Sequence, residues 1–109
     1  MAYFITQKDV DDLLHFAALS AATHLKIPNI EWESTSTLVA AISSKDQNLA
    51  TTLSEFMAAY IAWFKFHEEL EANGKAGNLD VLENEGLMKV MDLRDIKRQA
   101  FIAALKGNA

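Results

Sequence analysis

The sequence predicts an all-α fold, a compact bundle of four or five helices around a long central helix at about residues 46–73. Apolar residues recur at helical spacing along most of the chain, and no alternating pattern is long enough to indicate a sheet. Polar residues suited to capping precede the apolar segments at Thr6, at Ser34 or Thr35, and at Asp46. The chain has 109 residues, half of them hydrophobic, so we expect a single helical domain over residues 1–109.

The segment from Asp46 to Asn73 is the longest predicted helix. At 3.6 residues per turn its apolar residues form two stripes. The first stripe consists of Leu49, Leu53, Phe56, Met57, Tyr60, Phe64 and His67, and the second of Ala59, Trp63, Phe66 and Leu70. Together they cover roughly 220° of the helical wheel, whereas one packed face needs about 100°. This helix should therefore be the spine of a bundle or half of a contact between chains.

Two shorter helices are expected before it. The first runs from about Gln7 to Leu25, with Thr6 as its N-cap, and Pro28 disfavours its continuation. The connector that follows could form a short extended piece that folds Trp32 back over the core. A second helix is expected over about Thr35–Ser44.

The last third of the chain gives a weaker helical pattern. Asn73 and Gly74 should end the long helix, because glycine readily adopts the left-handed conformation found at helix C-termini. Residues 74–78 should form a flexible loop, and residues 79–91 one broken or two short helical pieces, because Gly86 interrupts the apolar pattern. A final helix is predicted to begin at Asp92 and to end at about Lys106.

Composition favours a cytoplasmic protein. The chain has no cysteine, which excludes disulfides and thiolate metal sites. Residues 1–6 lack the basic start of a signal peptide, and the longest apolar run, residues 56–64, is far short of the ~18 residues needed to span a bilayer. We expect no membrane association.

The charge of −5 is unevenly distributed. Residues 1–67 carry −3, residues 68–85 carry −5 and residues 86–109 carry +3. The acidic region, defined here as residues 68–85, repels phosphate polyanions and suits a basic protein partner, although a solvated helix end is the simpler explanation. Arg94 and Arg98 share a helical face, but this patch is too small to favour nucleic-acid binding.

The histidines offer the most plausible chemistry. His67 and Glu71 lie one helical turn apart, with Tyr60 nearby on the same stripe. If the first and third helices run parallel, His24 would join His67 and Glu71 in a candidate metal or proton-transfer cluster. The spacing matches no known metal signature, and a histidine bonded to its neighbouring carboxylate explains the pair more simply. Since no nucleophile elbow or phosphate-binding loop is present, we expect no catalytic residue, cofactor or bound metal.

The second stripe of the long helix is the best candidate for a binding surface. Interface centres are enriched in aromatic residues, so Trp63, Phe66 and Leu70, with Glu68 and Glu69 beside them, are the predicted partner interface. Either the terminal helix or a second chain must cover this stripe. The sequence thus favours a non-enzymatic protein-interaction module, such as a homodimer, adaptor or small inhibitor. The alternative is a helical bundle that binds a small ligand or metal.

Overall fold

The protein is built from helices. The computed structural model describes residues 5–74 and 78–107, and within these ranges it contains four helices and no strand. They are α1 (Gln7–His24), α2 (Thr35–Lys45), α3 (Gln47–Ala72) and α4 (Val81–Gly107). The predicted all-α class and the long central helix are confirmed.

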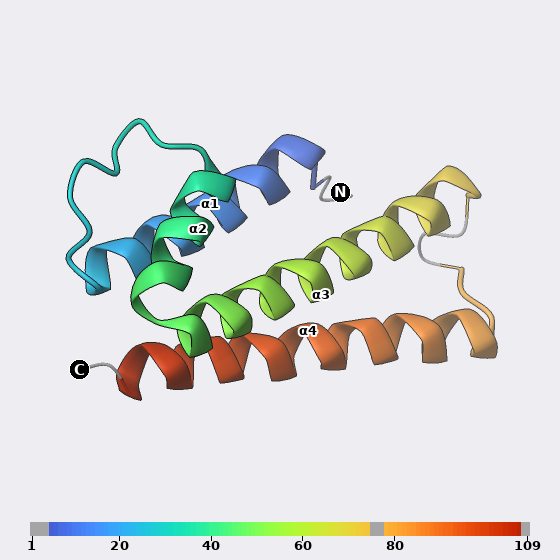
Figure 1. The fold of residues 1–109 in the computed structure, drawn as a ribbon. Coiled ribbons are helices and arrows are strands. Elements are labelled where there is room, and N and C mark those ends of the chain that lie inside the picture. Colours follow the sequence, from blue (N-terminus) through green and yellow to red (C-terminus); the bar gives the residue numbers. More distant parts are fainter. Residues whose placement is uncertain (1–4, 75–77, 108–109) are drawn as a thin grey trace.

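α3 lies at the centre of the structure, with α4 on one side and α1 and α2 on the other (Figure 1). α3 and α4 run antiparallel as a long hairpin, while α1 and α2 lie on the other side of the N-terminal half of α3. The remaining half of the hairpin extends beyond them, and the molecule measures 47 × 26 × 20 Å. Its radius of gyration is 15.8 Å, compared with about 13 Å for a compact domain of this length. The bundle is therefore elongated along the hairpin.

Hydrogen bonds at the first turns explain where α1 and α2 begin. The Thr6 hydroxyl accepts a hydrogen bond from the Asp9 amide at 3.1 Å, and the Asp9 carboxylate accepts one from the Thr6 amide at 2.9 Å. Ser34 caps α2 by accepting from the Thr37 amide at 3.2 Å. These side chains satisfy amides that have no partner within their helices. Both predicted starting points are confirmed.

Asp46 is the single residue between α2 and α3. Its backbone N–H donates to the Ile42 carbonyl at 2.7 Å, and its carboxylate accepts from the Leu49 amide at 3.1 Å. One residue therefore ends α2 and caps α3, as the sequence predicted for α3. The short link leaves little freedom in the angle between the two helices.

The last third of the chain corrects the sequence prediction. α4 is one continuous helix, so the predictions of a break at Gly86 and of a new helix at Asp92 are both wrong. Its start was missed: the Asp80 carboxylate accepts from the Glu83 amide at 2.8 Å, and the Glu83 carboxylate accepts from the Asp80 amide at 3.1 Å. Glycine inside a helix costs only about 1 kcal/mol relative to alanine, and packing readily offsets such a cost.

The end of α3 agrees with the sequence. Gly74 has a φ of 69°, and its amide donates to the Glu71 carbonyl at 3.0 Å, which closes the helix. Of the loop predicted to be flexible over residues 74–78, residues 75–77 lie outside the described residues.

The core lies mainly where α1, α2 and α3 meet, and Phe101 of α4 extends it. The largest fully buried side chains are Val10, Leu38, Ile42, Leu49 and Leu53. No polar or charged side chain is buried among the described residues. Trp32 is 97% exposed, so the prediction that it folds over the core is wrong.

Candidate functional site

α4 of the same chain contacts the predicted interface stripe, through Arg94 at Trp63 and through Gly86 at Phe66. Trp63 and Leu70 are only 8% and 9% exposed, and Phe66 is half-buried with its ring against Gly86. The burial of Trp63 within the single chain agrees with the first alternative, cover by the terminal helix, and the partner interface stays a prediction. Glu68 and Glu69 remain exposed beside it. A partner could reach these two carboxylates, but it would find Trp63 and Leu70 already buried.

Arg94 contributes to this cover. Its guanidinium carbon lies 4.6 Å from the centre of the Trp63 ring and 5.9 Å from that of Tyr60, distances at which a cation is attracted to an aromatic face. The same guanidinium pairs with Asp95 at 3.3 Å. Arg94 is therefore directed toward α3, and the basic patch considered for nucleic acid loses one of its two arginines.

An aromatic row follows α3 beneath α4. Phe101 stacks on Phe56 with ring centres 6.0 Å apart, and edge-on contacts at 5.8 Å and 5.4 Å continue the row through Tyr60 to Trp63. The His67 ring follows at 5.7 Å from Trp63. These geometries are favourable for aromatic pairs. In this row only the Phe56–Phe101 stack joins α3 to α4, and the other ring contacts lie within α3.

The candidate metal residues do not all come together. His67 Nε2 lies 3.8 Å from Glu71 Oε1, so that pair forms as expected. α1 and α3 run in opposite directions (Figure 1), so the parallel arrangement on which His24 depended is wrong. His24 is exposed at the end of α1, on the side of the N-terminal end of α3. Across residues 5–74 and 78–107, no group of three or more His, Cys, Asp or Glu is placed to hold a metal ion.

A groove of about 340 Å³ opens between α1 and α4, over α3. It was not predicted, because its lining comes from three helices whose arrangement the sequence does not specify. The lining residues are Leu13, Phe16, Ala17, Phe56, Tyr60, Arg98, Phe101 and Ile102. Arg98 is the one charged residue among them. Leu13 and Phe16 are exposed although both are large and apolar.

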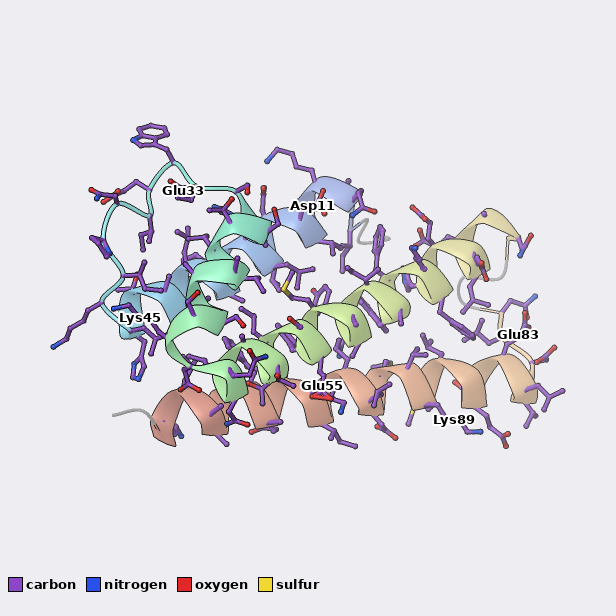
Figure 2. The ribbon with its side chains drawn as sticks, in the orientation of Figure 1. Asp11, Glu33, Lys45, Glu55, Glu83 and Lys89 are labelled. Atoms are coloured by element: carbon purple, nitrogen blue, oxygen red, sulfur yellow. The ribbon has the colours of Figure 1, made fainter. Side chains whose placement is uncertain are left out.

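The outward face of α4 is the second surface that the sequence analysis missed. Large apolar side chains on it are between 44% and 78% exposed. They are Val81, Leu82, Met88, Leu93 and Ile96. Lys89, which follows Met88 in the sequence, points away from α3 and marks this side of α4 (Figure 2). The surface could have been found from the sequence if residues 81–107 had been treated as one helix.

No family model, curated protein or solved structure matches this chain. Among the described helices, none is both long enough and apolar enough to cross a membrane. Inference about function therefore depends on two surfaces, the groove between α1 and α4 and the outward face of α4.

Proposed function

We propose that this chain is a non-enzymatic protein-interaction module that pairs with a second copy of itself through the outward face of α4. In the proposed dimer the two α4 helices lie antiparallel about a two-fold axis near Leu93 and Ile96. The observation that carries the proposal is the exposure of large apolar side chains on a helix whose two halves have opposite charge.

The apolar side chains supply the attraction. Leu93 and Ile96 are 44% and 63% exposed near the middle of α4, and Leu82 is exposed toward its start. Neighbouring apolar side chains exposed on one element are typical of interaction surfaces. Pairing two copies would remove this surface from water, and the favourable free energy of that burial increases with the apolar area buried.

The charges favour an antiparallel arrangement. Residues 79–92 contain four acids and Lys89, a charge of −3, whereas residues 93–107 contain four bases and Asp95, a charge of +3. A two-fold axis near the boundary brings each acidic half beside the basic half of the other copy, and a parallel pair would set like charges together. Glu68, Glu69 and Glu71 near the end of α3 add further negative charge at the same end of the hairpin. Like the absence of cysteine, such a dimer is compatible with the cytoplasm, where we place the protein.

Sedimentation velocity tests the proposal directly. We expect a dimer at a protein concentration of about 100 µM, where an association with a micromolar Kd is nearly complete. Leu93→Asp with Ile96→Asp should give a monomer whose helical circular dichroism is unchanged, because both side chains are exposed. Trp32→Asp is the matched control, since it removes a fully exposed apolar residue away from α4 and should leave the dimer intact.

Single cysteines define the direction of pairing, because the native chain has none. Leu93→Cys lies near the proposed axis and should form a disulfide-linked dimer. Leu82→Cys should not, since 11 residues at 1.5 Å each place its two copies about 33 Å apart in an antiparallel pair. A monomeric native protein, or equal crosslinking of both variants, would contradict the proposal.

A further inference from the structure

We infer that the groove between α1 and α4 binds an apolar monocarboxylate, with the ligand's hydrocarbon part against Phe56, Tyr60 and Phe101 and its carboxylate on the guanidinium of Arg98. This site is separate from the α4 face proposed for self-association. The inference depends on the lining of the groove, on its size and on the position of a single cation.

The lining suits a hydrocarbon. Three helices contribute to it: α1 supplies Leu13 and Phe16, α3 supplies Phe56 and Tyr60, and α4 supplies Phe101 and Ile102. Phe56 and Phe101 are each 5% exposed and stack on one another, so the floor is firmly packed before any ligand arrives. Its volume of about 340 Å³ lies at the lower end of the range for small-molecule sites.

Arg98 supplies the single charge. The two basic residues nearest to it in sequence have partners within the chain: Arg94 lies over Trp63, and Lys97 pairs with Glu55 at 3.2 Å. Figure 2 shows Glu55 on the side of α3 that faces α4. Arg98 forms no ion pair with any described residue. A guanidinium presents paired N–H donors that match the two oxygens of a carboxylate.

The combination selects the class of ligand. One cation beside an apolar wall favours a ligand with one negative charge and a hydrocarbon part. A polyanion would find no second base in the lining, and a neutral hydrocarbon would leave Arg98 without a contact. An amphipathic helix from another protein is the competing occupant, and it would cover a longer surface than this groove.

Calorimetry with decanoate and with decanol tests whether the groove prefers a hydrocarbon that carries a carboxylate. We expect decanoate to bind the native protein with a Kd below about 1 mM, and decanol, which has the same chain without the charge, to bind at least about tenfold more weakly, the factor that about 1.4 kcal/mol of charge-assisted bonding gives. Arg98→Gln should abolish this preference. Lys106→Gln is the matched control, since it removes an exposed base from the same helix outside the groove.

Chemical shifts locate the ligand. Decanoate should perturb the amides of Leu13, Phe16 and Ile102, and it should do so equally in the Leu93→Asp, Ile96→Asp variant. Three results would overturn the inference: no binding by the native protein, equal decanoate affinity in native protein and Arg98→Gln, or perturbation confined to the outward face of α4. Because the double aspartate variant tests self-association separately, failure of one proposal is distinguishable from failure of the other.

Discussion

Gly86 of α4 lies directly against the ring of Phe66 of α3. A β-carbon at position 86 would stand 2.8 Å from Cζ of that ring, closer than side-chain carbons normally approach. The glycine therefore serves helix packing and does not break the helix. This contact joins the C-terminal half of α3 to the first turns of α4, in the part of the hairpin that extends beyond α1 and α2.

The Gly86 contact predicts strong coupling between the two positions. In the native protein, Gly86→Ala should bring no gain in stability, because displacing the Phe66 ring offsets the gain of about 1 kcal/mol in helix propensity. In a Phe66→Ala background the same substitution should stabilise by about 1 kcal/mol. Urea unfolding of the four proteins measures the coupling, and additive effects would contradict it.

Phe101 should be the most important residue for attaching α4 to the core. Phe101→Ala should lower the free energy of unfolding by about 3–5 kcal/mol, because the ring is buried against Phe56. Phe16→Ala removes the same side chain from a position that is 70% exposed, and should cost less than about 1 kcal/mol. Similar losses in the two variants, measured by urea unfolding, would show that α4 is not anchored in this way.

The two tryptophans should differ in access to solvent. Trp63 is 8% exposed beneath Arg94, and Trp32 is 97% exposed. Acrylamide should therefore quench the fluorescence of Trp63→Phe strongly, because the exposed Trp32 remains, and that of Trp32→Phe weakly, because the buried Trp63 remains. The difference should disappear in denaturant. Equal quenching of the folded variants would mean that α4 does not cover Trp63 in solution.

The stability of the first turn of α1 should depend on pH. Hydrogen bonds from the backbone N–H of Thr6, and then from its hydroxyl, lower the pKa of Asp9 below its ordinary value of 3.8. A lowered carboxyl pKa stabilises the fold above the unfolded-state pKa, and this contribution is lost as the pH falls through the folded-state pKa. NMR titration should give an Asp9 pKa below 3.8 in the native protein and a value closer to ordinary in Thr6→Ala. Because Thr6→Ala removes the hydroxyl but keeps the backbone N–H, an unchanged Asp9 pKa in this variant would contradict the contribution of the hydroxyl.

The first three helices could be predicted because their ends are encoded locally. Thr6, Ser34 and Asp46 each cap the helix that follows through bonds within three residues, so the sequence contains both partners. α4 was divided wrongly because Gly86 was treated as a local signal. Its meaning depends on Phe66, 20 residues earlier, which only the paired helices bring into contact.

The surfaces were harder to predict than the helices. The breadth of the apolar arc on α3 correctly indicated two sets of neighbours, and it left open whether the terminal helix or a second chain would be one of them. Because α4 covers Trp63, the large apolar side chains that remain exposed on the helices lie on the far side of α4 and in the groove beside α1. Both results depend on the directions of α1 and α4 relative to α3, and helical periodicity does not specify direction.

The overhang of the α3–α4 hairpin has a consequence for how the molecule opens. Beyond α1 and α2 the protein is two helices thick, and acidic residues are concentrated there. Amide hydrogens near residues 68–74 and 81–86 should exchange with solvent well before those of residues 49–56, through partial unfolding that leaves the inner core intact. These two helix ends would thus unfold and refold together as a separate cooperative unit while the rest of the bundle stays folded.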